Sequence, residues 1–323
     1  MKSGTILVLA SSTDAQVAKL DSLDRNWTIV VGDSIGNFQQ AAVDATVVLN
    51  WSGSGELLRG VFKMCPHLQW VHMRSAGLDN VLFPEIIASA VQVTNSKGIF
   101  SESLAEFVLS AILYFAKDFR RMIRNQASGV WAPFEVTTIS GQTVGIVGYG
   151  DIGRAIARKV SQMGMRVIAL KRSVLLPDYS DDLVDQLYGP GQLIEMISQC
   201  DYLVVSTPLT AETRNLIGAP EIAAMRKTAA IINVGRGPVI NEDALIEALG
   251  EGRVKGAALD VFDKEPLPDG HPFYKLVNVL LSPHCADHTA EWLDDAMQFF
   301  VEQIKRFSGH QPLQNVVDKI LGY

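Results

Sequence analysis

Three side chains suited to acid–base chemistry follow successive apolar runs in the second half of the chain: Arg236, Glu265 and His284. An arginine fork grips a carboxylate through two parallel hydrogen bonds and polarises a neighbouring carbonyl. A histidine can give a proton to a carbonyl oxygen, and a nearby carboxylate holds the ring and favours its charged form. Taken singly, each has an ordinary structural alternative: a surface arginine beside a glycine turn, a solvated glutamate, and a core or turn histidine with a satisfied ring. Their shared position just past strands of one expected sheet favours a common active site.

A glycine-rich stretch, TVGIVGYGDIG at 143–153, precedes them. It runs from a β-branched strand through a tight turn into a helix, and a second apolar strand follows at 166–170. In such a βαβ unit the first glycine allows the turn, the second admits a pyrophosphate and the third lets the helix approach the strand. The N–H groups at the start of the helix then face the diphosphate. The predicted phosphate contacts are Gly148, Gly150, Asp151, Ile152 and Gly153.

The end of the second strand indicates which dinucleotide binds. An NAD site places an acid there for the ribose hydroxyls, whereas this strand ends in Lys171, Arg172 and Ser173. Two cations and a hydroxyl suit a 2′-phosphate, so we predict NADP(H) in preference to NAD(H). The alternative is that both cations are merely solvated. Asp178 and Asp181 lie too far along the chain to replace the missing acid.

The elements that must position these residues form two α/β domains. Short apolar runs alternate with helix-like stretches over the first ~95 residues, which predicts a parallel sheet covered on both faces. An uninterrupted segment at 101–126 predicts one continuous connecting helix, and six strands with intervening helices follow it. The apolar spacing at 288–307 predicts a packed helix that returns to the first domain. We therefore expect a discontinuous first domain of residues 1–99 and 291–323, and a doubly wound dinucleotide-binding domain of residues 100–290.

Composition narrows the class of protein. The 323 residues include 28 Lys plus Arg and 35 Asp plus Glu, a formal net charge of −7, with no basic patch. This argues against a nucleic-acid partner, and no apolar run approaches the length of a membrane span. The three cysteines are far apart and fit a reducing compartment. We expect a cytoplasmic protein.

The chain resembles the D-isomer-specific 2-hydroxyacid dehydrogenases over nearly its full length. The matching segments are SAGLDNV (75–81), SESLAEFVL (101–109), GQTVGIVGYGDIG (141–153), CDYLVVSTPLTAETRNLI (200–217), AAIINVGRGPVINEDALIEAL (229–249), GAALDVFDKEPLP (256–268) and SPHCADHT (282–289). The resemblance implies a Rossmann domain, a second, flavodoxin-like α/β domain and a homodimer. The segment after Trp131 and the helix from Ser101 would lie near the dimer interface.

The resemblance also implies residue roles. Arg236 binds and polarises a 2-oxo acid, Glu265 supports the histidine, and His284 is the acid/base. Backbone N–H groups around Ala76 and Gly77 hold the substrate carboxylate. The remaining predicted cofactor contacts are Thr207 and Pro208 on the adenosine side, Val234, and Asp260 at the nicotinamide carboxamide.

The reaction that follows is hydride transfer between a nicotinamide cofactor and a small 2-oxo or D-2-hydroxy acid such as glyoxylate or hydroxypyruvate. An NAD-dependent D-hydroxyacid or phosphoglycerate dehydrogenase is one alternative. A dinucleotide-sensing protein like the family's corepressors is another. The complete set of Arg236, Glu265 and His284 favours the enzyme.

Other residues near these motifs have two interpretations. Arg74 precedes the carboxylate loop, where it either selects a substrate with a second anionic or polar end or pairs with an acid of its own domain. Trp51 either lines the same pocket or is a packed aromatic. His284 and His288 are four apart but lack an evident third ligand, so we predict no metal. Cys285 lacks the base of a nucleophilic cysteine, and Ala286 stands where the family often has glycine.

Overall fold

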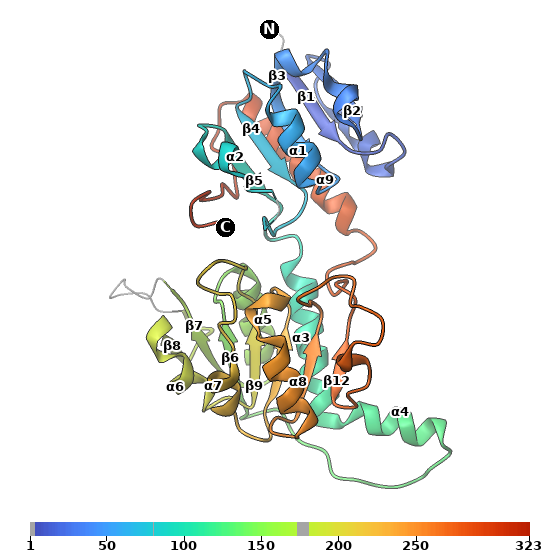
Figure 1. Cartoon of the computed structure of the whole chain (residues 1–323), viewed down its shortest axis with the longest axis vertical. Coiled ribbons are helices and arrows are strands. Elements are labelled where there is room, and N and C mark those ends of the chain that lie inside the picture. Colours follow the sequence, from blue (N-terminus) through green and yellow to red (C-terminus); the bar gives the residue numbers. More distant parts are fainter. Residues whose placement is uncertain (1–3, 80, 173–180) are drawn as a thin grey trace. The chain divides into compact units, whose positions relative to one another are not determined.

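The computed structural model describes residues 4–79, 81–172 and 181–323. It divides into two compact units: Met1–Ile99 with Thr289–Tyr323, here called unit 1, and Phe100–His288, called unit 2. Each unit has its own parallel sheet (Figure 1). Among the described residues, no helix combines the length and apolar character needed to cross a bilayer.

Unit 1 is built on five parallel strands in the order β2-β1-β3-β4-β5. This is the flavodoxin-like order, with a switch point between the first and third strands. The strands are β1 (Gly4–Leu9), β2 (Trp27–Gly32), β3 (Ala45–Asn50), β4 (Trp70–Met73) and β5 (Gln92–Asn95). The α-helices are α1 (Gly55–Phe62), α2 (Pro84–Ala88) and α9 (Trp292–Ser308). The 3-10 helices, labelled η, are η1 (Ala15–Ser22), η2 (Ile35–Phe38) and η3 (Ala42–Asp44).

Alternation along β1 divides the core of unit 1 into two layers. Leu7 and Leu9 pack with α1 and α2 on one face of the sheet. Ile6 and Val8 pack with α9 on the other face, which is the period-two pattern of a strand buried on both sides. Figure 1 shows α1 and α9 on opposite sides of this sheet. The C-terminal helix thus belongs to the first sheet.

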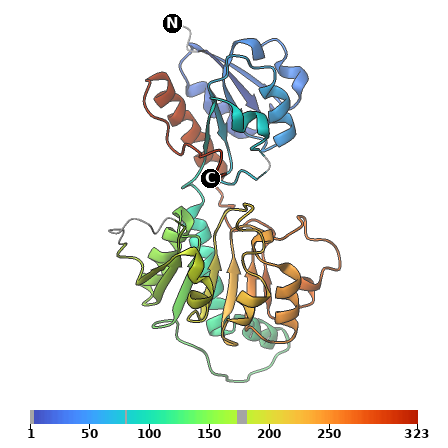
Figure 2. The ribbon, with the colours of Figure 1, turned by 60° about the vertical axis from the view of Figure 1, so that its left-hand side comes forward.

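Unit 2 has seven parallel strands in the order β12-β11-β10-β9-β6-β7-β8, covered by helices on both faces (Figure 2). Counted from β6, the first six follow the doubly wound order 3-2-1-4-5-6. The strands are β6 (Thr143–Val147), β7 (Arg166–Leu170), β8 (Gln186–Tyr188), β9 (Tyr202–Val205), β10 (Ala230–Asn233), β11 (Gly256–Leu259) and β12 (Val279–Leu281). The predicted fold class, a doubly wound sheet with a second flavodoxin-like domain, is confirmed.

The helices of unit 2 include both α-helices and 3-10 helices. They are α3 (Ser101–Lys117), α4 (Phe119–Ala127), α5 (Asp151–Gln162), η4 (Pro190–Gln192), α6 (Leu193–Ile197), α7 (Ala219–Ala223), η5 (Gly237–Val239), α8 (Glu242–Gly250) and η6 (Pro272–Tyr274). The short edge strand β8 was not among the six predicted, because its three residues carry too little pattern to recognise.

The prediction of one continuous helix at 101–126 is wrong. The helix breaks at Asp118, which has φ of 50° and ends α3 with an N–H bond to the Tyr114 carbonyl. The side chain of Asp118 also caps α4, because its carboxylate accepts a hydrogen bond from the N–H of Arg121. Aspartate tolerates the left-handed conformation and caps helices well, so one residue ends one helix and begins the next.

Candidate active site

The predicted catalytic residues follow three neighbouring strands of unit 2. Arg236 comes after β10, Glu265 after β11 and His284 after β12. These strands pair in parallel, with Leu259 of β11 opposite both Asn233 and Leu281. Because parallel strands end at the same edge, the loops that carry the three side chains leave the sheet together.

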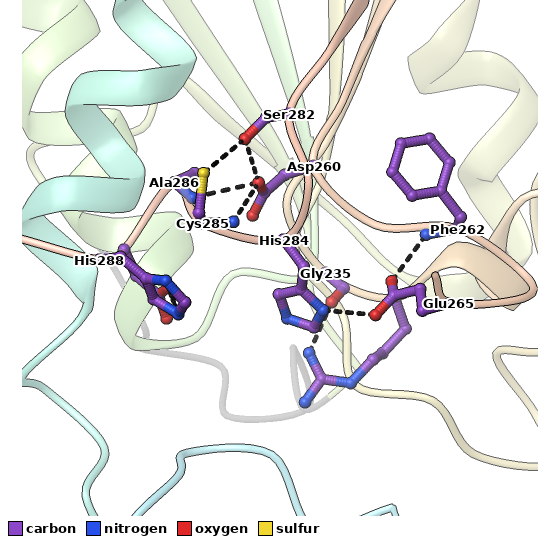
Figure 3. Close-up of polar contacts among 11 residues, drawn as sticks. Gly235, Asp260, Phe262, Glu265, Ser282, His284, Cys285, Ala286 and His288 are labelled. Atoms are coloured by element: carbon purple, nitrogen blue, oxygen red, sulfur yellow. Dashed lines mark hydrogen bonds and ion pairs between the residues drawn. The ribbon is translucent and has the colours of Figure 1, made fainter. Parts of the chain in front are cut away.

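His284 and Glu265 form a hydrogen-bonded pair. The Nδ1 of His284 lies 2.7 Å from Oε2 of Glu265, and Oε1 of the same carboxylate accepts from the N–H of Phe262 at 2.9 Å. Figure 3 shows the two side chains pointing toward each other. An ionised carboxylate only accepts, so Nδ1 carries the hydrogen. Within the described chain Nε2 has no hydrogen-bond partner, and the histidine side chain is 44% exposed. The ring is therefore oriented to exchange a proton through Nε2.

An apolar pocket lies against this pair. Its volume is about 610 Å³. Besides Glu265 and His284 its lining residues are Phe262, Pro266, Leu267, Tyr274, Leu281, Ser282 and Pro283. An apolar wall lowers the local dielectric, so charge interactions at the pair are stronger than they would be in water.

Asn233, at the end of β10, shapes the loop of Arg236. Its side chain donates to the carbonyl of Arg236 at 3.0 Å and accepts from the N–H of Gly235 at 3.0 Å. The Arg236 guanidinium donates to the Gly235 carbonyl at 2.7 Å. A Cβ on Gly237 would lie 1.9 Å from the carbonyl carbon of Phe262. Only glycine fits there, so the loops of Arg236 and Glu265 interlock through their backbones.

Asp260 anchors the loop that carries His284. Its side chain is buried, and Oδ1 accepts from the Ser282 hydroxyl at 2.5 Å and from the N–H groups of Cys285 and Ala286 at 3.0 and 3.1 Å. Figure 3 shows this cluster beside His284. His284 itself has φ of 52°, a conformation that non-glycine residues adopt only when neighbours hold them. A positioning task for Asp260 was not predicted from the sequence.

The second histidine of this loop lies apart from the pair. His288 is 3.7 Å from Asp287, and burial raises the pKa of the Asp287 carboxyl, with His288 opposing that shift. Throughout the described part of the chain, no group of three His, Cys, Asp or Glu side chains could hold a metal ion. Cys285 is an exposed free thiol.

The glycine turn has the space that a diphosphate needs. A Cβ on Gly153 would lie 2.4 Å from the Gly148 carbonyl oxygen, and Gly148 has φ of 100°. A Cβ on Gly150 would meet no atom of the described residues within 4 Å. The first N–H groups of α5, at Asp151 and Ile152, have no acceptor within the helix. These features fit a dinucleotide phosphate at the helix N-terminus.

The predicted adenosine-side residues lie next to this turn. The buried hydroxyl oxygen of Thr207 has no hydrogen-bond partner among the described residues, and its methyl group lies 2.7 Å from where a Cβ on Gly148 would be. The Pro208 carbonyl accepts from the Thr213 hydroxyl at 2.6 Å. Val234 is buried, and its N–H pairs with the carbonyl of Val205. A buried oxygen without a partner is uncommon, and a bound ligand would satisfy it.

The predicted 2′-phosphate residues follow β7. The N–H of Lys171 donates to the Tyr188 carbonyl, and Arg172 lies 3.4 Å from Glu212 in an exposed ion pair. Ser173 falls outside the described residues.

A carboxylate that seemed too distant in sequence reaches the glycine turn. Asp181 accepts from the hydroxyl of Tyr149 at 3.0 Å and lies 3.2 Å from the guanidinium of Arg154. Its side chain is nearly buried. Sequence distance hid this contact, because the fold returns residue 181 to the turn.

In unit 1 the predicted carboxylate loop is braced from β5. Asn95 donates to the Ala76 carbonyl at 2.8 Å, and the Ser75 hydroxyl donates to the Gly77 carbonyl at 2.8 Å. Among the described residues, neither the N–H of Ala76 nor that of Gly77 makes a hydrogen bond, so both donors can serve a bound carboxylate. Trp51 is buried in the core as a packed aromatic, and the guanidinium of Arg74 lies 5.4 Å from its ring.

Comparisons with known proteins identify the family of this chain. The family described as "D-isomer specific 2-hydroxyacid dehydrogenase, NAD binding domain" matches residues 109–286. Glyoxylate reductase of Korarchaeum cryptofilum is 32% identical over 265 residues, which are 80% of this chain and 79% of that one.

Two solved structures extend the likeness to the whole chain. A D-isomer specific 2-hydroxyacid dehydrogenase from Xanthobacter autotrophicus Py2, in complex with NADPH and MES, has a TM-score of 0.83 at 30% identity, covering 99% of both chains. The NADPH-dependent glyoxylate/hydroxypyruvate reductase of Sinorhizobium meliloti, in complex with NADP and sulfate, has a TM-score of 0.85 at 27% identity over the same shares. With the glycine turn fitting a nicotinamide dinucleotide, the chain belongs to the D-isomer-specific 2-hydroxyacid dehydrogenases, a family of NAD(P)-dependent oxidoreductases.

Proposed function

We propose that this enzyme reduces small 2-oxo acids of the glyoxylate or hydroxypyruvate type to D-2-hydroxy acids with NADPH. The observation that carries the proposal is the oriented pair of His284 and Glu265, 2.7 Å apart, with the loop of Glu265 interlocked with that of Arg236. The likeness to glyoxylate reductases supports the substrate class.

In this proposal each group of the site has a defined role. His284 donates a proton from Nε2 to the carbonyl oxygen, and Glu265 holds the ring through Nδ1. Arg236 binds the 2-oxo acid and stabilises the negative charge that grows on its oxygen. The N–H groups of Ala76 and Gly77 hold the substrate carboxylate.

The cofactor's place follows from the fit described above. The turn of Gly148, Gly150 and Gly153 with the start of α5 would hold the diphosphate, and Thr207 the adenosine side. When bound, the reduced nicotinamide supplies the hydride. Asp260 keeps the loop of His284 in place and, as the resemblance implies, accepts from the carboxamide.

The preference for NADP(H) rests on Lys171 and Arg172 at the end of β7. The ion pair of Arg172 with Glu212 is exposed and long at 3.4 Å, so it contributes little and yields easily to a phosphate. The NADPH complex of the related Xanthobacter enzyme supports this preference. NAD(H) remains the alternative.

The cofactor proposal is tested with the double variant Lys171→Ala, Arg172→Ala. It should lose roughly 10- to 100-fold in kcat/KM with NADPH while changing little with NADH, because charged hydrogen bonds to a phosphate are lost. Lys227→Ala is a matched control, since this exposed lysine precedes β10 at the opposite end of the strands. An equal loss with both cofactors would contradict the assignment.

We also propose that the enzyme is a homodimer. Exposed apolar side chains gather on α4 and the segment after it: Phe119, Met122, Ile123, Val130, Trp131 and Val136. Trp131 is 97% exposed. In Figure 1 this part of the chain projects from the rest of unit 2. Patches of this kind on one chain usually mark a protein interface. Light scattering should give twice the chain mass, and Ile123→Asp should shift it toward the monomer.

The activity itself is tested by initial rates with glyoxylate, hydroxypyruvate and pyruvate, each with both cofactors. Turnover with glyoxylate or hydroxypyruvate and NADPH is expected. Tight cofactor binding without turnover of any 2-oxo acid would refute the proposed reductase activity and favour a dinucleotide sensor.

A further inference from the structure

Arg74 occupies an aromatic clamp in unit 1. It follows β4, and its guanidinium carbon lies 5.4 Å from the ring of Trp51, just past β3, and 5.4 Å from the ring of Trp292, the first residue of α9. Each ring contributes a cation–π contact that holds the guanidinium, whose planar fork of N–H donors can bind an anion. Three separate elements thus fix one cation at the carboxyl ends of neighbouring strands.

The Arg74 guanidinium has no anion in direct contact within the described chain. Its side chain has no hydrogen bond or ion pair among those residues, and only its backbone N–H pairs, with the Asn50 carbonyl. Burial lowers the pKa of the guanidinium, which Asp14 partly offsets. By contrast, Arg59 of the same unit makes three hydrogen bonds to Glu85. Desolvating a cation without an anion costs free energy, so Arg74 is arranged to receive one.

A second set of groups that can bind an anion lies close to Arg74 in the sequence. The loop of Ala76 and Gly77, braced by Asn95 and Ser75, presents the N–H groups assigned above to the substrate carboxylate. Arg74 and Gly77 are three positions apart in the chain, so their Cα atoms are at most about 10 Å apart. That distance, shortened by the reach of the arginine side chain, suits a molecule with a carboxylate at each end of a chain of roughly four or five carbons.

We propose that Arg74 binds a distal carboxylate of the substrate, so that 2-oxo dicarboxylic acids are reduced in preference to 2-oxo acids with an apolar end. A carboxylate matches the fork because it accepts two parallel hydrogen bonds. In the reaction C2 gains a hydride and its oxygen gains the proton from His284, while the reduced nicotinamide is oxidised. This inference rests on the proposed 2-oxo acid reduction and names its substrate class.

The test compares substrates of equal length that differ in the distal carboxylate: oxaloacetate against 2-oxobutyrate, and 2-oxoglutarate against 2-oxovalerate. With the wild-type enzyme and NADPH, kcat/KM should be at least roughly tenfold higher for the diacid of one pair. Arg74→Gln should abolish that preference, chiefly through KM, and Arg74→Lys should restore part of it. Trp292→Leu should reduce it less than Arg74→Gln does.

Arg59→Gln is the matched control, since it removes an arginine of the same unit that is already paired, and it should keep the preference. Equal kcat/KM within both pairs, alongside turnover of glyoxylate, would overturn this inference and leave the proposed function standing. A stronger preference for a 2-oxo acid with a distal phosphate, 3-phosphohydroxypyruvate, would overturn the assignment of a carboxylate. Absence of turnover with every 2-oxo acid would instead overturn the proposed function.

Discussion

The two sheets of this enzyme share a plan but differ where the first strand turns into its helix. In unit 2, β6 leads through Gly148, Gly150 and Gly153 into the twelve-residue helix α5. In unit 1, β1 leads through Ala10 to Asp14 into the 3-10 helix η1, which has no side-chain cap. Topology supplies a switch point in both. Only unit 2 has the glycine turn and the long helix whose geometry fits a phosphate, so such a site depends on the residues and not on the fold alone.

The two units also hold contrasting histidines. His72, in β4, is fully buried, with Nδ1 2.7 Å from the Thr94 hydroxyl and Nε2 3.3 Å from the Ser96 hydroxyl. Burial lowers its pKa to about 3. His284, after β12, is exposed and paired with a carboxylate. A histidine satisfied by hydroxyls in the core stays neutral and structural, whereas one with a free nitrogen at a loop can move protons.

The largest effect should come from His284→Ala. We expect kcat to fall by about 10²- to 10⁴-fold, because a positioned general acid is lost. NADPH affinity, measured by fluorescence titration, should stay within about threefold of wild type, because His284 lies outside the glycine turn. Glu265→Gln should cost less, since an amide still holds the ring. If His284→Ala lowered kcat by less than about tenfold, His284 would not be the general acid. The contrast with the structural His72 would then not hold.

Gly153→Ala should have the next largest effect. The new Cβ would lie 2.4 Å from the Gly148 carbonyl oxygen, which pushes α5 away from β6. We expect a loss of about 1–3 kcal/mol in the free energy of unfolding and weaker NADPH binding. Gly36→Ala in unit 1 is the control, because nothing lies within 4 Å of its Cβ. Similar urea midpoints for both variants would show that the glycine turn is not closely packed.

The smallest effect concerns His72. Its pKa is lowered from 6.5 to about 3 in the folded chain. Between these pH values the unfolded chain binds a proton that the folded chain does not. The contribution of His72 to the free energy of unfolding is therefore complete above pH 6.5. As the pH falls below 6.5, this contribution decreases by at most about 1.4 kcal/mol per pH unit. Urea unfolding at pH 7 and pH 5 measures this loss, which His72→Gln should reduce. The same loss in both proteins would show that other groups cause it.

Local pattern was sufficient for most of the fold. Hydrophobic runs and glycines identified most of the parallel strands and the glycine turn, because central strands such as β6, β9, β10 and β11 are buried throughout and show as continuous apolar runs. It failed at Asp118, where the left-handed backbone of one residue breaks a helix without any proline or glycine. It also missed β8, whose place at the sheet edge depends on pairing with β7.

The sequence by itself determined the order of the catalytic candidates and the family, since residue types just past consecutive strands carry that information. Only the tertiary structure decided that Glu265 holds Nδ1 of His284, that Asp260 anchors the loop that carries His284, and that two tryptophan rings lie against Arg74. Trp292 and Arg74 are more than two hundred residues apart in the chain. Such contacts depend on the packing of α9 against the first sheet, and the free energy that creates them is a property of the folded chain rather than of any local segment.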